Sequence, residues 1–279
     1  MAKGPYIVRI SSQKGGVGKT TIAVNLATVL SMLDYKVLLV DADYANPSVG
    51  FHLGLENVNR GFADIGAKRV DPKSVIVTHA PTGMHVIPGR VGGKVVYPSI
   101  SQIEWQFKIL REENYDFAIV DTAPGILPFV ENVYLKNYDE AVIVTTPEMA
   151  SCTSAIRLAH VYDTLGLKHS LVVNRMRNKR YEISIQEIEE SYEGSVTGAV
   201  PEDEIVPLSI AEHIPAYLLN QRCGFSEGVS RASKRYAARV GGRYASKREG
   251  MSLWDRLLTV LGLRKRNRVL ASVEKEEEE

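Results

Sequence analysis

The sequence predicts an α/β fold with a doubly wound, mostly parallel sheet in a single domain, followed by a C-terminal amphipathic tail. Three observations predict this fold. Short apolar runs alternate with helical patterns along most of the chain. A glycine-rich loop joins the first apolar run to the first helical pattern. The chain has 279 residues, which is enough for one large α/β domain and a tail.

Five short runs rich in β-branched residues predict buried parallel strands, at 6–11, 37–40, 117–120, 141–144 and 171–173. Residues 75–88 predict a further strand pair, or a strand and a loop. Helical patterns separate most of the runs and predict helices at 20–33, 100–113 and 151–165. A surface helix is expected over 178–194, and the last helix of the domain at about 227–239, before a pair of glycines.

These elements place the domain at residues 1–242. A basic linker at 243–251 follows it, and then an amphipathic helix with a basic cluster at 252–268. The last segment, 269–279, is acidic and expected to be disordered.

Residues 14–21 read Lys-Gly-Gly-Val-Gly-Lys-Thr-Thr and lie between an apolar run and a helical pattern. A strand, a glycine loop and a helix in this order present consecutive backbone N–H groups and a helix N-terminus to a phosphate. Lys19 can reach the β- and γ-phosphates, and the Thr20 hydroxyl can bind Mg²⁺. The alternative is a glycine-rich turn that binds nothing. The predicted nucleotide-binding residues are Lys14, Gly15, Gly16, Val17, Gly18, Lys19, Thr20 and Thr21.

The loop departs from the general phosphate-loop pattern G-x-x-x-x-G-K-[ST], which would have glycine at position 13. The chain has Gln13 there, and Lys14 adds a cation at the mouth of the loop. Lys19 already serves the phosphates. Lys14 therefore either has a role beyond its own loop or is a solvated charge.

Acidic residues follow two of the predicted strands, and ligands of open α/β sheets bind beyond such carboxyl ends. Asp121 is predicted to hold Mg²⁺ through its water shell, and Gly125 to bring a backbone N–H to the γ-phosphate. Asp41 and Asp43 would face the same way if their strand continued. The alternatives are that Asp121 caps the next helix and that Asp43 lies in a solvated turn.

Composition excludes several classes of protein. The formal net charge of +1 indicates no particular partner, although basic residues gather at 229–268. Cys152 and Cys223 are too far apart for a CxxC motif, which indicates a reducing interior and no metal framework. The six histidines show no metal spacing. No signal peptide and no transmembrane run is visible, so we expect a cytoplasmic protein.

The loop with its first lysine resembles the deviant Walker A motif, KGGxGK[ST], of the MinD/ParA ATPases. The run KVLLVDAD, followed by Asn46 and Pro47, resembles the second strand and switch I of that family. The resemblance implies ATP and Mg²⁺ as cofactors and catalytic roles for Lys14, Lys19 and Asp43. Lys14 would reach across a dimer interface to the partner's nucleotide, and Asp43 would orient the attacking water.

The same resemblance assigns further residues to the site. Asp41 would support the metal bound by Thr20 and Asp121, and Asp43, Asn46 and Gly125 would belong to the switch regions. Asn174 would contact the adenine, together with its neighbour Arg175 and the backbone around Pro201 and Glu202. An asparagine offers one donor and one acceptor, which suits an adenine edge, although a lone asparagine at a strand end is more often a turn residue.

The tail from residue 252 predicts an amphipathic helix. At about 100° per residue, an apolar face with a tryptophan forms, and a basic cluster at 264–268 adjoins it. This pattern is typical of a helix that lies in the plane of an anionic membrane surface, and the tail resembles the membrane-targeting helix of MinD proteins. Docking on the domain's own surface and packing against a second copy are the alternatives. The predicted membrane residues are Leu253, Trp254, Leu257, Leu258 and Leu261.

The resemblance therefore implies a MinD-like ATPase. It would bind MgATP, form a homodimer when ATP is bound, associate peripherally with the inner face of the cell membrane and hydrolyse ATP slowly. This activity would organise cellular components or the division site, together with an unidentified activating or cargo protein. A ParA-type DNA partition ATPase, an FlhG-type flagellar-number regulator and a nucleotide-bound scaffold without turnover are the alternatives.

Overall fold

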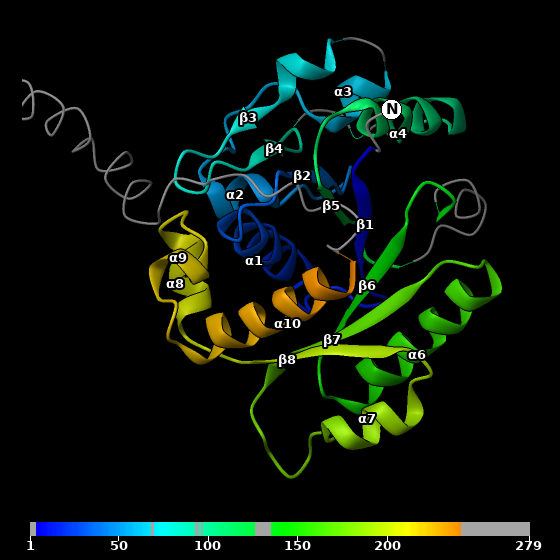
Figure 1. Ribbon diagram of the computed structural model, residues 1–279, viewed down its shortest axis with the longest axis vertical. Coiled ribbons are helices and arrows are strands. Elements are labelled where there is room, and N and C mark those ends of the chain that lie inside the picture. The colour runs from blue at the N-terminus through cyan, green and yellow to red at the C-terminus, as the bar shows by residue number, and fades with distance from the viewer. Residues whose placement is uncertain (1–3, 68–69, 93–94, 96, 126–134, 241–279) are drawn as a thin grey trace, which may run out of the picture.

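The computed structural model describes residues 4–67, 70–92, 95, 97–125 and 135–240, and the predicted membrane residues of the tail lie outside this part. Within it, a single sheet of eight strands runs through the centre (Figure 1). In chain order the strands are β1 Tyr6–Ser11, β2 Val37–Ala42, β3 Val77–Thr78, β4 His85–Ile87, β5 Phe117–Thr122, β6 Glu140–Thr145, β7 His169–Met176 and β8 Ser195–Pro201.

The order of strands across the sheet is β3-β4-β2-β5-β1-β6-β7-β8. Every neighbouring pair is parallel except β3 and β4, which pair antiparallel at one edge. The strands β1, β2, β5 and β6 are buried along their whole length, because helices cover both faces of the sheet. The predicted doubly wound, mostly parallel fold is confirmed.

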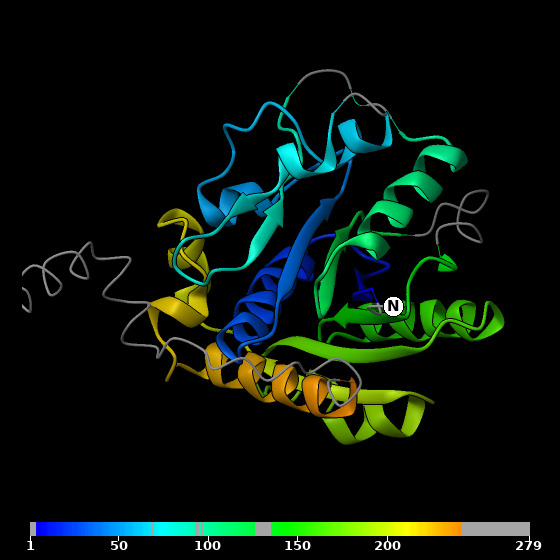
Figure 2. The same ribbon diagram turned by 45° about the horizontal axis from the view of Figure 1, so that its top comes forward.

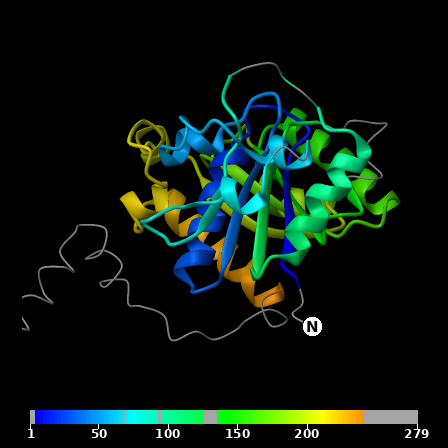
Figure 3. The same cartoon turned by 90° about the horizontal axis from the view of Figure 1, so that it is seen from above.

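The helices form two layers around this sheet, as Figures 2 and 3 show. One layer contains α1 and α10, and the other contains α4 and α6. The first layer encloses α1 between the sheet and α10, so residues 21–31 of that helix are all buried. The helices are α1 Lys19–Met32, α2 Val49–Leu53, α3 Phe62–Gly66, α4 Ile100–Glu112, α6 Met149–Thr164, α7 Ile185–Ser191, α8 Ile205–Ala211, α9 Ala216–Leu219 and α10 Gly224–Val240, with a 3₁₀ turn at Pro72–Val75.

One strand, β8, is missing from the sequence-based prediction. It contains Gly198 and ends at Pro201, and both residue types are depleted in strands. A Cβ atom at Gly198 would lie 2.6 Å from the Cβ of Ala232 on α10. The close packing of α10 on the sheet therefore requires a residue that weakens the sequence signal for a strand.

The surface helix expected over 178–194 is wrong in its extent, because α7 begins only at Ile185 and ends at Ser191. Ser184 and Glu187 form a capping box that fixes this start. The Glu187 N–H donates to the Ser184 hydroxyl at 3.2 Å, and the Ser184 N–H donates to the Glu187 carboxylate at 2.8 Å. The other predicted helices agree with the structure to within a few residues.

The fold brings the predicted site residues to the end of the sheet where the carboxyl ends of its parallel strands lie. The glycine loop leaves the carboxyl end of β1, and the carboxyl ends of β2 and β5 lie beside it, with Asp41 directly opposite Asp121 in register. No helix in the described part of the chain is long and apolar enough to span a bilayer.

Candidate nucleotide-binding site

The glycine loop has the backbone that a phosphate-binding loop needs. Gly16 and Gly18 adopt φ values of 77° and 92°, a left-handed conformation that favours glycine. Gly18 is the residue before α1, which begins at Lys19. The first N–H groups of a helix have no partner within the helix and can bind an anion. Val17 and Thr21 are buried and anchor the loop in the core.

The side chains at the start of α1 contact the end of β5. The Thr20 hydroxyl donates to Oδ2 of Asp121 at 2.5 Å. Asp121 is 1% exposed, and its burial raises the pKa of the carboxyl, while the Thr20 hydrogen bond and the Lys19 ammonium oppose the rise. Oδ1 of Asp121 is buried without a hydrogen-bond partner among the described residues.

These oxygens fit Mg²⁺. A buried carboxylate oxygen without a donor is costly, and Mg²⁺ usually takes one or two carboxylates together with phosphate oxygens and water. Thr20 and Asp121 would hold the ion, which neutralises phosphate charge when bound. No group of three or more His, Cys, Asp or Glu side chains able to hold a metal occurs within the described ranges. Two protein oxygens leave the other ligand positions of the ion to phosphate oxygens and water.

Asp41 organises the loop that follows β2. Its Oδ2 accepts from the N–H groups of Ser48 at 2.8 Å and Val49 at 2.9 Å, and its Oδ1 from the N–H of Asp43 at 3.2 Å. Burial raises the pKa of the Asp41 carboxyl, and the neighbouring Asp121 raises it further. Both oxygens of Asp41 thus bind backbone N–H groups, and its support of a metal stays a prediction.

Asp43 lies in a turn, which is the alternative that the sequence offered, but the residue itself is buried. Asp43 is 9% exposed, and its Oδ1 accepts from the N–H groups of Ala45 at 3.2 Å and Asn46 at 2.9 Å. Asn46 is exposed. The N–H of Asp43 donates to Asp41, and its charge lies near enough to Asp121 to raise the pKa of that carboxyl. The catalytic role of Asp43 stays a prediction.

The backbone N–H of Gly125 has a different partner from the one that the sequence predicts. Its N–H, expected at a γ-phosphate, donates to the carbonyl of Ser12 at 2.8 Å, with φ 84° at Gly125. The Ser12 hydroxyl in turn donates to the carbonyl of Lys14 at 2.6 Å. Sequence reasoning missed Ser12, although a hydroxyl residue between a strand and a glycine loop is a recognisable signal.

The two lysines of the loop lie in different surroundings. Lys19 is buried next to Asp121, whereas Lys14 is exposed at the mouth of the loop. The side chain of Lys14 makes no hydrogen bond or ion pair within the part of the chain that the structure describes. Lys14 is thus a solvated charge in the single chain, free to meet another group.

The residues predicted to contact the adenine lie at the carboxyl ends of the neighbouring strands β7 and β8. The Asn174 amide Nδ2 donates to the carbonyl of Val17 at 2.9 Å, so this side chain contacts the loop itself. Arg175 has φ 60° and is exposed. Glu202 follows the last residue of β8, Pro201, and its carboxylate pairs with Arg177. Their adenine contacts stay predictions.

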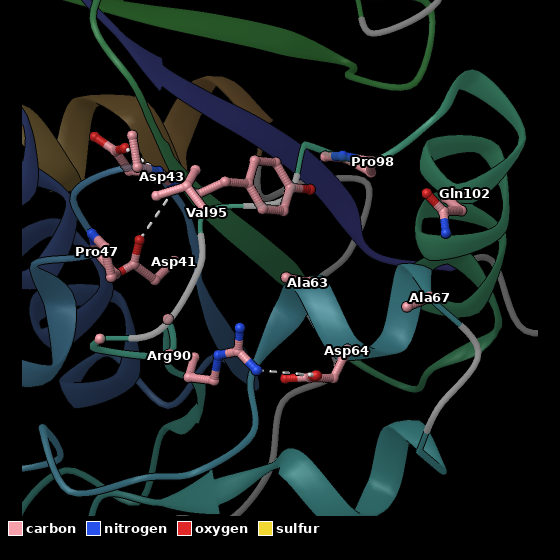
Figure 4. Close-up of a pocket in the computed structure, with 14 residues that line it drawn as sticks. Asp41, Asp43, Pro47, Ala63, Asp64, Ala67, Arg90, Val95, Pro98 and Gln102 are labelled. Atoms are coloured by element: carbon pink, nitrogen blue, oxygen red, sulfur yellow. Dashed lines mark hydrogen bonds and ion pairs between the residues drawn. The ribbon is translucent and has the colours of Figure 1, made fainter.

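A pocket of about 150 Å³ opens beside Asp41 and Asp43 (Figure 4). Figure 4 shows that the side chains of Arg90 and Asp64, which line the pocket, point toward each other, with 3.9 Å between Nη1 of Arg90 and Oδ1 of Asp64. Gln102 on α4 lines the side of the pocket away from Asp41 and Asp43. A Cβ atom at Gly89 would lie 3.1 Å from the Asp41 carboxyl carbon, so the chain passes very close to the carboxylate there.

Comparison with known proteins assigns the family. A family model described as an AAA domain matches residues 6–173. An uncharacterised ATP-binding protein of Methanocaldococcus jannaschii is 32% identical over 203 residues, which are 72% of this chain and 76% of that protein. The putative septum site-determining protein MinD of Guillardia theta is 30% identical over 220 residues, 76% of this chain and 81% of the relative. The chain belongs to the MinD/ParA family of ATPases.

A solved structure agrees with the fold of this MinD/ParA ATPase. The septum site-determining protein MinD of Pyrococcus horikoshii, complexed with Mg-ADP, has a TM-score of 0.78 and 24% identity. The match covers 87% of this chain and 100% of that chain. The family and the loop geometry together support nucleotide and Mg²⁺ binding at the edge described above.

Proposed function

We propose that this MinD/ParA protein binds MgATP, forms a homodimer in the ATP-bound state, attaches to the inner face of the cell membrane through its tail and hydrolyses ATP slowly. Hydrolysis would return the protein to the cytoplasm. In this cycle the protein would organise the division site or other cellular components, together with an activating or cargo protein. The Mg-ADP complex of the Pyrococcus horikoshii relative supports the choice of nucleotide.

The exposed and unpaired side chain of Lys14 carries the proposal. A lysine at a phosphate loop that only served its own nucleotide would duplicate Lys19, which is already buried beside Asp121. A strongly hydrated ammonium in the open can instead reach the phosphates of a second chain. We therefore assign Lys14 to the nucleotide of the partner in an ATP-bound dimer.

The oligomeric state tests the role of Lys14. Light scattering after gel filtration should give a dimer for the wild type with MgATP and a monomer with MgADP. Lys14→Ala should stay monomeric with MgATP but bind the nucleotide, whereas Lys19→Ala should not bind it. Lys168→Ala is the control, because Lys168 is exposed at the opposite edge of the sheet, before β7. A dimer of Lys14→Ala equal to that of the wild type would refute the assignment.

Two substitutions at Asp43 separate catalysis from turn formation. Asp43→Asn keeps an oxygen that can accept from Ala45 and Asn46, whereas Asp43→Ala removes it. If the carboxylate orients the attacking water, both variants should hydrolyse ATP at the background rate and accumulate as dimers. Wild-type turnover by Asp43→Asn would mean that Asp43 only shapes the turn.

Vesicle sedimentation tests the membrane step. The full chain should pellet with anionic vesicles in MgATP and much less in MgADP, since two tails on one dimer raise the effective concentration. A chain that ends at Gly250 should stay in the supernatant with either nucleotide. Equal pelleting of all three samples would contradict the proposal.

DNA binding of the ParA type is the second candidate, and α10 supports it. Its outer face carries Arg231, Lys234 and Arg235, all exposed, and of these Arg231 pairs with Glu227 at 3.8 Å. Non-specific binding to duplex DNA that falls steeply with salt, and falls further in Lys234→Ala, would favour this function. The membrane assay above should then show no dependence on the tail.

A further inference from the structure

Four exposed apolar side chains lie on α2 and on the segment that contains α8. They are Phe51, Leu208, Ile210 and Ile214, each 36–49% exposed, and we call them the α2–α8 patch. Figures 1 and 2 show α2 beside α8 and α9, and α2 and α8 are in contact. Apolar side chains gathered on the surface of a soluble protein often mark a contact site.

His213 joins the two parts of the patch. Its Nδ1 lies 2.6 Å from the carbonyl oxygen of Phe51, and a Cβ atom at Gly54 would lie 3.5 Å from the Cβ of His213. His213 has φ 55°, a conformation that is uncommon for a residue with a Cβ atom. The two segments therefore form one surface, although 162 positions separate Phe51 from His213 in the chain.

Carboxylates flank the α2–α8 patch. Residues 202–214 contain four acidic residues and no lysine or arginine. Two of the four, Glu204 and Glu212, make no side-chain hydrogen bond or ion pair within the part of the chain that the structure describes. Oε2 of Glu56, three residues after α2, is buried without a hydrogen-bond partner among the same residues. A segment that fits this surface should therefore combine apolar and basic side chains.

The tail of this chain has this composition. Its predicted helix combines an apolar face, which includes Trp254, with four basic residues at 264–268, all of them outside the described residues. We propose that the apolar face of the tail docks on the α2–α8 patch of the same chain in the ADP-bound state, with the basic cluster beside the carboxylates. The tail is then withheld from a membrane, because the same apolar face cannot bind the patch and a bilayer at once.

The tail is long enough to reach the patch. Ser226 near the start of α10 donates its hydroxyl to the carbonyl of Ala216 on α9 at 3.3 Å, so the patch lies near the start of α10. The tail follows the other end of α10, which has 17 residues and is about 25 Å long. The eleven residues 241–251 can span up to about 36 Å when extended. They can therefore bring the helix predicted from residue 252 back to the patch.

The nucleotide site can control the patch through α2. Ser48, directly before α2, and Val49, its first residue, donate their N–H groups to Asp41, which lies opposite Asp121 in register. A change of charge beside Asp121 therefore acts on the loop that holds the start of α2. Docking would thus make the release of the tail depend on the nucleotide. This regulation rests on the proposed function, whereas the docking itself does not.

The fluorescence of Trp254 tests the docking. The chain has two tryptophans, so Trp105→Phe leaves Trp254 as the only one. In MgADP without vesicles, Trp254 of the full chain should be shielded from the quencher acrylamide. Leu208→Glu and Ile214→Glu, each made in this background, should shift the docking equilibrium at least about tenfold toward the free tail and so raise the quenching. Leu33→Glu is the matched control, because Leu33 is 38% exposed directly after α1, and it should leave Trp254 shielded.

Thermal unfolding would show that the variants are folded. Equal quenching of Trp254 in the Trp105→Phe chain and in both patch variants would overturn the docking and leave the patch to a partner protein. Shielding that grows with protein concentration would overturn it too, in favour of a second copy of the chain.

Vesicle sedimentation separates the docking from the proposed function. In MgADP, Leu208→Glu should pellet with anionic vesicles more than the wild type does, because its tail is free. If Trp254 is shielded in the Trp105→Phe chain and exposed in Leu208→Glu, but no chain pellets with either nucleotide, the docking stands and the proposed membrane function is wrong.

Discussion

The buried histidine His79 should make the stability of the protein depend on pH. It follows the short strand β3, and its Nδ1 lies 2.8 Å from Oγ1 of Thr82 within the turn before β4. His79 is 7% exposed, and its burial lowers the pKa of the imidazole from 6.5 to about 4. The folded state therefore holds this side chain neutral at pH values where the unfolded chain would protonate it.

The sign and the size follow from proton linkage. Between pH 6.5 and 4 the unfolded state binds more protons at His79 than the folded state, so the free energy of unfolding falls as the pH falls. With these two pKa values, the loss between pH 7 and pH 5 is about 2 kcal/mol. His79→Asn removes the titrating group and keeps a polar atom near Thr82, so it should remove this part of the loss.

Urea unfolding at pH 7 and pH 5 measures the effect as a difference between variants. The difference is needed because the raised pKa values of Asp41 and Asp121 act in the opposite direction, stabilising the folded state as the pH falls. His160→Asn is the control, since His160 is exposed on α6, and it should keep the wild-type pH dependence. If the wild type and His79→Asn lose equal stability between the two pH values, the reasoning from burial is wrong.

Two further predictions concern polar contacts at opposite edges of the sheet. Thr20→Val cannot donate to Asp121, so the affinity for MgATP should fall at least about tenfold, whereas the affinity for ATP without a metal should fall less. If calorimetry shows equal losses of affinity for the two ligands, Thr20 has no role in metal binding. Arg239→Ala leaves the carboxylate of Glu140, which is 1% exposed, without its ion-pair partner. It should lower the free energy of unfolding by about 2 kcal/mol in urea, less than for a fully buried pair because the Arg239 side chain is 38% exposed. MgATP affinity should stay unchanged, because Glu140 begins β6 at the end of the sheet away from the glycine loop. Unchanged stability would mean that the hydroxyls of Tyr6 and Ser170, which also donate to this carboxylate, satisfy it without Arg239.

The sequence predicts the central strands well because helices cover both their faces. Such strands are rich in apolar β-branched residues, as in β1 and β6, and this pattern is visible without any contact information. The prediction fails at β8, where the packing of α10 selects Gly198 and the strand ends in proline. The short helices α2, α8 and α9 have too few residues for a helical period to be read.

The same distinction applies to the site: the sequence predicts the features that depend on neighbouring residues and misses those that depend on distant contacts. The order of residues in the glycine loop predicts a phosphate loop followed by a helix from residue 20, one residue after the observed start at Lys19, because both features depend on neighbours in sequence. The hydrogen bond from Asn174 to the same loop joins residues far apart in the chain, and no local pattern encodes it. The bond from the Gly125 N–H to Ser12 likewise depends on how two loops meet after folding.

The carboxyls of Asp41 and Asp121 connect the order of a loop to the charge of the site. Spacing in sequence does not bring them together; the parallel register of β2 and β5 does. Asp41 holds the N–H groups of Ser48 and Val49 best when it is ionised, yet burial and the neighbouring Asp121 raise its pKa and oppose ionisation. A cation bound at Asp121 would favour the ionised form of both carboxyls and so strengthen these bonds. We therefore expect the order of the loop after β2 to depend on the charge bound beside Asp121.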